Sequence, residues 1–124
     1  MFLIGCLFLF GLWFFGRGID RINNQLSVIA GVMGIGFANL ITQFINHSLF
    51  RPRPFIELDL VLLFYRPSDS SFPSNTAALG FAIATAIFIR FKRLGCFAYF
   101  LASLYGLARI YSGVHYPTDI LAGG

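Results

Sequence analysis

The fold of this chain is decided by one uncharged stretch, residues 26–45, which reads LSVIAGVMGIGFANLITQFI. A helix of this length extends about 30 Å, which is the thickness of the hydrocarbon core of a bilayer. Three further stretches lack Asp, Glu, Lys and Arg: residues 1–16, 70–89 and 94–108. The sequence therefore predicts an all-α protein, a polytopic bundle of transmembrane helices.

The composition of the whole chain supports this class. The chain has 124 residues, of which 57% are hydrophobic and 11% are charged, whereas roughly 25% are charged in ordinary soluble domains. Sixteen Phe residues and the lack of a basic run argue against binding to nucleic acid, although the isoelectric point is about 9.5. The expected environment is a lipid bilayer.

We expect four membrane-spanning helices and the start of a fifth. They cover residues 2–15, 26–45, 75–89 and 94–108, and the fifth begins near Pro117. Together they form one transmembrane domain, residues 1–124, which we expect to continue beyond both ends. Small residues recur every four positions in three spans and predict close helix packing: Ala30, Gly34, Ala38 and Thr42; Ser74, Ala78, Ala82 and Ala86; Ala98, Ala102 and Gly106.

The connecting segments alternate between the two sides of the membrane. The first side, residues 16–25 and 90–93, carries five cations and one acid, a net charge of +4: Arg17, Arg21, Arg90, Lys92 and Arg93 against Asp20. The second side, residues 46–74 and 109–119, is neutral: Arg51, Arg53, Arg66 and Arg109 against Glu57, Asp59, Asp69 and Asp119. The positive-inside rule predicts a cytoplasmic first side and an external second side.

Three polar segments on the second side carry the candidate chemistry. Residues 51–55, RPRPF, present two guanidinium groups, which can grip phosphate oxygens at two points. Residues 71–76, SFPSNT, open the third span, and free N–H groups at a helix start bind anions. Taken alone, the first segment also fits a juxtamembrane anchor and the second an ordinary helix cap.

The third segment contains Arg109, His115 and Asp119. Asp119 lies four residues after His115, so its carboxylate can accept the Nδ1 proton of the imidazole. That arrangement leaves Nε2 unprotonated as a nucleophile or base. Because the two anion-binding segments lie on the same side, the combination indicates a functional site.

These segments resemble the type 2 phosphatidic acid phosphatase superfamily, membrane lipid phosphatases related to the vanadium haloperoxidases. The resemblance rests on Arg53-Pro54, on Pro73-Ser74 and on the pattern Arg109-x5-His115-x3-Asp119. Residues 51–55 and 71–74 are similar to the undecaprenyl-diphosphatase branch, and residues 113–123, GVHYPTDILAG, are close to the bacterial third motif. The resemblance implies a six-helix bundle with one phosphoryl-transfer site at its outer face and no metal or other cofactor.

The resemblance also implies a role for each matching residue. His115 would attack phosphorus and form a phosphohistidine, while Asp119 would orient the imidazole ring. Arg53 and Arg109 would hold the non-bridging oxygens and stabilise charge in the transition state. The backbone amides of Ser74 and Asn75 would complete the phosphate cradle.

Two positions depart from the family pattern. Asn46 replaces a Lys seven residues before Arg53 and can hydrogen-bond a phosphate oxygen without adding charge. Thr76 replaces the His that protonates the leaving group, and such a general acid contributes roughly 10²–10⁴ in rate. A diphosphate instead expels a phosphate group, whose pKa is about 6. The replacement is therefore more tolerable in a diphosphatase than in a monoester phosphatase.

The expected protein is a bacterial enzyme of the plasma membrane that hydrolyses undecaprenyl (polyprenyl) diphosphate to the monophosphate, with its active site facing outside. Its partners would be a polyprenyl or glycerolipid phosphate and the bilayer. Two alternatives stay open. One is a catalytically impaired phosphatase-like protein that binds lipid phosphates, and the other is a phosphatidate or phosphatidylglycerophosphate phosphatase.

Overall fold

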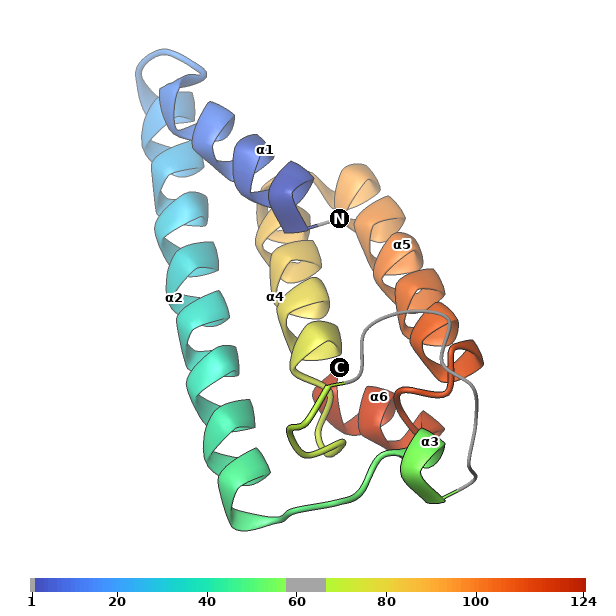
Figure 1. Ribbon diagram of the computed structural model, residues 1–124. Coiled ribbons are helices and arrows are strands. Elements are labelled where there is room, and N and C mark those ends of the chain that lie inside the picture. The colour runs from blue at the N-terminus through green and yellow to red at the C-terminus, as the bar shows by residue number, and fades with distance from the viewer. Residues whose placement is uncertain (1, 58–66) are drawn as a thin grey trace.

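A computed structural model describes residues 2–57 and 67–124 of the chain. Within these residues all regular structure is helical: α1 (Phe2–Phe14), α2 (Ile19–Ser48), α3 (Pro54–Glu57), α4 (Asn75–Arg90), α5 (Lys92–Tyr111) and α6 (Pro117–Gly123). In Figure 1 the helices α1, α2, α4 and α5 form an elongated bundle, and α3 and α6 lie at one end of it. The all-α prediction is confirmed. Two residues of the charge count, Asp59 and Arg66, lie outside the described residues.

Two helices are clearly longer than the predicted spans: α2 extends over Ile19–Ser48 instead of residues 26–45, and α5 over Lys92–Tyr111 instead of residues 94–108. By length and mean hydropathy, α2 and α5 could each cross a membrane, whereas α1 and α4 are shorter, with 13 and 16 residues. Helix α2 begins at Ile19, well before the predicted start at residue 26. The polar residues of its first turns, which include Asp20, can remain helical because a helix need not end at the membrane boundary.

Helix α4 is the centre of the bundle, where it packs against α1, α2, α5 and α6. The predicted stripes of small residues on α4 and α5 largely face this packing. Ala78 and Ala86 are buried on α4, and Ala102 and Gly106 are buried on α5. The prediction of close packing through small residues is confirmed for these two helices.

On α2 the predicted stripe is wrong at Ala30 and Gly34, which are exposed, but Thr42 is buried as predicted. The buried face of α2 instead consists of Asn24, Ser27, Val28, Gly31 and Thr42. A helix makes one turn in about 3.6 residues, so a strict four-residue repeat rotates steadily around the helix axis. Over three repeats the predicted stripe therefore rotates from the exposed face, at Ala30, to the face that packs against α4, at Thr42.

Because only one face of α2 packs against α4, replacing two of its glycines by alanine should affect stability differently. A Cβ atom at Gly31 would lie 2.6 Å from the Cβ atom of Ala86, whereas a Cβ at Gly34 would meet nothing within 4 Å. Overpacking of a tight interface costs roughly 1–3 kcal/mol. We expect Gly31→Ala to lower the melting temperature of the protein in detergent and Gly34→Ala to leave it unchanged or raise it. Equal melting temperatures would contradict this helix contact.

The two ends of the bundle match the two predicted sides. At one end, Arg90 from α4 donates from Nη2 to Asp20 at 2.9 Å and from Nε to Asn24 at 2.6 Å. The α1–α2 and α4–α5 turns therefore lie together. At the other end, the segment after α2, the segment before α4 and the α5–α6 turn converge (Figure 1). The prediction that the three motif segments share one side is confirmed.

Candidate active site

The three motif segments enclose a polar cavity of about 290 Å³. Its lining comes from the end of α2, from the segment that leads into α3, from residues 67–73 before α4, from the start of α4 and from the α5–α6 region. The lining residues are Asn46, Arg53, Pro67, Ser68, Asp69, Ser70, Pro73, Asn75, Thr76, Arg109 and His115. This list contains every predicted site residue except Ser74 and Asp119.

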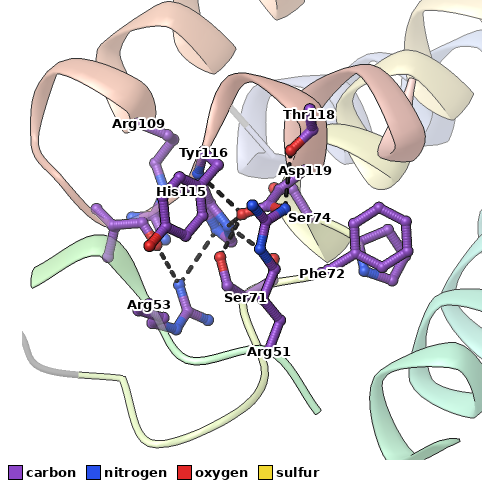
Figure 2. A network of polar contacts seen from close by, with 12 residues as sticks. Arg51, Arg53, Ser71, Phe72, Ser74, Arg109, His115, Tyr116, Thr118 and Asp119 are labelled. Atoms are coloured by element: carbon purple, nitrogen blue, oxygen red, sulfur yellow. Dashed lines mark hydrogen bonds and ion pairs between the residues drawn. The ribbon is translucent and has the colours of Figure 1, made fainter. Parts of the chain in front are cut away.

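The His115 imidazole is buried, with 3% of the residue exposed, and both ring nitrogens have a partner. Nδ1 lies 3.0 Å from the carbonyl oxygen of Ser71, and Nε2 lies 3.3 Å from Nη1 of Arg53. A carbonyl can only accept and a guanidinium can only donate. These partners therefore assign the proton to Nδ1 and leave the lone pair on Nε2, at the cavity (Figure 2). This supports the predicted unprotonated Nε2.

The predicted hydrogen bond between Asp119 and His115 is wrong. The Nδ1 atom of His115 lies 3.8 Å from Oδ2 of Asp119, which is too long for a hydrogen bond. The four-residue spacing would align the two side chains only if both were helical, but α6 begins at Pro117. The Asp119 carboxylate instead accepts the backbone N–H of Tyr116 at 2.8 Å. It also accepts the hydroxyl of Ser71.

Ser71 therefore connects the carboxylate to the imidazole. Its hydroxyl donates to Asp119 and its carbonyl accepts from His115, and the Ser71 residue is fully buried. Asp119 acts on the ring through Ser71 and through charge at 3.8 Å. This arrangement could not be predicted from residue types, because the acceptor is a backbone carbonyl 44 positions away.

Arg53 is held in one orientation beside the imidazole (Figure 2). Only 3% of the residue is exposed. Its Nη1 donates to the carbonyl of Val114 at 3.0 Å, and its Nη2 donates to Oδ1 of Asp69 at 2.8 Å. The guanidinium plane is thus fixed at the cavity next to Nε2 of His115.

Arg109 lines the same cavity. One of its hydrogen-bond donors has no partner within the described part of the chain. Its Nε atom is buried and has no hydrogen-bond partner there. A buried donor without a partner costs roughly 1–3 kcal/mol, and an anionic oxygen that accepts a hydrogen bond from Nε would remove that cost. This supports the predicted role of Arg109 in holding an anion.

Arg51, the first guanidinium of RPRPF, faces away from the cavity. Its Nη1 donates to Oδ1 of Asp119 and to the hydroxyl of Thr118, both at 2.8 Å. Its guanidinium carbon also lies 4.1 Å from the centre of the Tyr116 ring. Of the two arginines that the sequence offered for phosphate binding, the structure places Arg53 at the cavity and Arg51 behind it, on Asp119 (Figure 2).

The start of α4 also differs in part from the prediction. Ser74 is fully buried and caps the helix by accepting the N–H of Ala77 at 3.3 Å. Its own N–H donates to the carbonyl of Asp119 at 3.0 Å, so the predicted contact between the Ser74 amide and phosphate is wrong. Asn75 and Thr76, in the first turn of α4, do line the cavity. Asn46 lines it from α2 and donates weakly to the carbonyl of Pro73, at 3.5 Å.

The surroundings of His115 lower its pKa from 6.5 to about 4. Burial is the largest cause, followed by the positive charges of Arg53 and Arg109. The hydrogen bond that Nδ1 donates to the Ser71 carbonyl and the charge of Asp119 act in the opposite direction but are weaker. At neutral pH the imidazole is therefore uncharged, as a nucleophile must be.

This pKa predicts the acid limb of the pH–rate profile. As the pH falls from 7, the free enzyme should keep its neutral imidazole until the pH approaches about 4, and kcat/KM should decline only below that value. The profile of kcat/KM reports groups of the free enzyme, so it is the quantity to measure. An acid limb near the ordinary histidine pKa of about 6.5 would contradict the burial of His115 between two cations.

A neutral imidazole beside the fixed guanidinium of Arg53, in a cavity that Arg109 also lines, is suited to transfer of an anionic group such as a phosphoryl group. Comparison with known proteins agrees with this class. Residues 26–124 match the model of the PAP2 superfamily, and the chain belongs to this superfamily.

Several relatives are similar to most of the chain. It is 33% identical over 115 residues to the undecaprenyl-diphosphatase BcrC of Bacillus subtilis, covering 93% of the chain and 58% of that protein. It is 32% identical over 114 residues to the putative undecaprenyl-diphosphatase YbjG of Escherichia coli, covering 90% of the chain and 55% of that protein. The chain thus spans little more than half the length of these relatives.

The fold matches a solved structure, the transmembrane PAP2 type phosphatidylglycerolphosphate phosphatase from Bacillus subtilis. The TM-score is 0.63 at 24% sequence identity, over 98% of this chain and 60% of the solved one. The helical bundle is therefore the fold of a transmembrane PAP2 protein.

Proposed function

We propose that the protein is a membrane lipid phosphatase that hydrolyses undecaprenyl or a similar polyprenyl diphosphate to the monophosphate. One observation carries this proposal: the uncharged Nε2 of His115 lies at a cavity lined by Arg53 and Arg109. Similarity to BcrC, an undecaprenyl-diphosphatase, and to YbjG, a putative one, supports the choice of a diphosphate.

The chemistry proceeds in two steps. Nε2 of His115 attacks the terminal phosphorus, the bond to the bridging oxygen breaks, and the lipid monophosphate leaves with the electron pair. Arg53 and Arg109 hold the non-bridging oxygens, which replace His115 as the partner of Arg53 Nη1. Water then cleaves the phosphohistidine and releases inorganic phosphate. Because the leaving group is a phosphate with a pKa of about 6, Thr76 need not supply a proton.

The same proposal places the active site at the outer face of the plasma membrane. The end of the bundle opposite the cavity carries the net charge of +4 from residues 16–25 and 90–93, and the positive-inside rule favours such an end in the cytoplasm.

The test measures phosphate release from farnesyl and undecaprenyl diphosphate by the full-length protein in detergent. We expect release by the wild type and none above background from His115→Ala. The matched control is His47→Ala, because His47 is exposed near the end of α2 and should not affect the rate. Failure of the wild type to release phosphate, or release that survives His115→Ala, would overturn the proposal.

Thr76 favours one competing function, a catalytically impaired protein that binds lipid phosphates. It lines the cavity where the family pattern has a general acid. We expect Thr76→His to change diphosphate hydrolysis by less than about threefold, because the leaving group hardly needs protonation. A gain of roughly 10²–10⁴ in the rate would instead identify an enzyme that has lost its acid. The measurement is the steady-state rate with farnesyl diphosphate.

A further inference from the structure

Cleavage of the phosphohistidine requires a group that accepts a proton from water. As the water oxygen bonds to phosphorus, one of its protons must leave. The Thr76 hydroxyl is a poor proton acceptor, and Arg53 and Arg109 have no acceptor at all. His115 cannot serve, because its Nε2 carries the phosphoryl group at this stage. The two-step chemistry thus needs a base that the family-like motifs do not supply.

One carboxylate lines the cavity in the part of the chain that the structure describes, and it belongs to Asp69. Its Oδ1 accepts from Nη2 of Arg53 at 2.8 Å. The other terminal nitrogen of the same guanidinium, Nη1, lies 3.3 Å from Nε2 of His115. A single planar group therefore holds the carboxylate and the nucleophile side by side.

The position of Asp69 is fixed while its carboxylate stays open to water. The backbone carbonyl of Asp69 accepts from Nε of Arg53 at 3.1 Å, so two bonds tie the residue to one guanidinium. The Asp69 side chain is 66% exposed, whereas that of Arg53 is 4% exposed. Water can therefore reach the carboxylate from the open side of the cavity.

We propose that Asp69 is a catalytic residue, the general base that activates water for cleavage of the phosphohistidine. This inference rests on the proposed function. The water oxygen bonds to phosphorus while its proton passes to the Asp69 carboxylate. The bond between phosphorus and Nε2 breaks, and its electron pair returns to Nε2. Inorganic phosphate leaves, and Asp69 releases its proton to solvent. No oxidant, reductant or further reactant takes part.

A different role for Asp69 predicts different kinetics. If the carboxylate only occupies Arg53 until a phosphate displaces it, then removing its charge should tighten substrate binding. In that case, a variant without the charge would have a lower KM, and no intermediate would accumulate. A base for the second step has the opposite signature, because the first step proceeds and the phosphoryl enzyme persists.

The test is Asp69→Asn in the full-length protein, with farnesyl diphosphate labelled at the terminal phosphorus. Asn keeps an acceptor for Arg53 but takes no proton from water. We expect a burst of farnesyl monophosphate equal to the amount of enzyme, and then a steady-state rate lower by roughly 10²-fold or more. The label should remain on the protein and disappear in the double variant with His115→Ala. Asp69→Glu should restore turnover in part.

Asp20→Asn is the matched control, because Asp20 is an exposed acid at the opposite end of the bundle. It should show neither the burst nor the label. An Asp69→Asn variant that slows the burst as much as the steady state, or that lowers only KM, would overturn the role of Asp69. If the wild type releases no phosphate, the proposed function itself fails, and that result is visible before any variant is compared.

Discussion

Replacing Arg53 with lysine is expected to lower kcat/KM for diphosphate hydrolysis by roughly 10³-fold, the lower end of the effect of a transition-state arginine. The guanidinium of Arg53 contacts the carbonyl of Val114, the carboxylate of Asp69 and Nε2 of His115 from one rigid plane. A lysine keeps the charge but offers a compact ammonium group without the planar fork. It cannot hold these partners and a phosphate oxygen together.

The loss should appear in kcat more than in KM, because the fork is aimed at charge that develops in the transition state. Arg90→Lys is the control. Arg90 also makes two side-chain hydrogen bonds, but at the opposite end of the bundle, so its replacement should leave the rate unchanged. Retention of more than about a tenth of the activity by Arg53→Lys, where roughly a thousandth is expected, would remove Arg53 from the chemistry.

The order and position of the helices could be predicted because a bilayer selects for uncharged side chains, and these can be counted in the sequence. Charged residues are excluded from the hydrocarbon core, so the stretches without charged residues indicated where α1, α2, α4 and α5 lie. The alternation of these helices then assigned each connecting segment to one side of the membrane. The start of α2 was misplaced because polar residues outside the core, such as Asp20, are compatible with either a helix or a loop. The small-residue face of α2 was misplaced because four-residue spacing only approximates the helical turn.

The site was predictable as a set of residues but not as a set of contacts. His115, Arg53 and Arg109 were identified from residue type and spacing, and they do line one cavity. Backbone groups carry no residue-specific signal, so the carbonyl of Ser71, which orients His115, could not be identified. For the same reason, the hydrogen bond that the Ser74 N–H donates to the carbonyl of Asp119 could not be predicted.

Asp69 was overlooked as a site residue, and Arg51 was assigned to the wrong role. A carboxylate beside an anion-binding segment is unfavourable by charge, so Asp69 was counted only in the balance of the external side. Arg51 was grouped with Arg53 because both are arginines that precede proline. Only the fold separates them, since it pairs Arg51 with Asp119 and Arg53 with Asp69.

The pairing of Arg51 with Asp119 leads to the second large expected effect. The Asp119 carboxylate is fully buried, and Arg51 reaches its Oδ1 at 2.8 Å. The Arg51 side chain is 39% exposed, but its removal would leave the buried Asp119 charge without its ion-pair partner, which is unfavourable. We expect Arg51→Met to lower kcat by roughly 10²-fold, by analogy with the upper end of what groups that orient metal ligands contribute. KM should change little, because Arg51 does not line the cavity.

The physical reason is that Asp119 needs its charge in order to hold Ser71 and the start of α6. Without Arg51, the carboxylate would lose its charge partner and turn toward water, and the carbonyl that accepts the Nδ1 proton of His115 would lose its support. Asp119→Asn removes the same charge directly. In an Asp119→Asn background, Arg51→Met should therefore cost much less than it does alone, because a lost partner is harmful only while the buried charge exists.

Steady-state kinetics of the two single variants and the double variant measure this coupling. Arg17→Met, an exposed arginine at the opposite end of the bundle, controls for loss of a positive charge in general. Losses that simply multiply in the double variant would show that Arg51 and Asp119 act independently, and the chain of contacts from Arg51 through Asp119 and Ser71 to His115 would then be wrong. A loss in the double variant close to that of Asp119→Asn alone means that Arg51 acts on the imidazole only through this carboxylate.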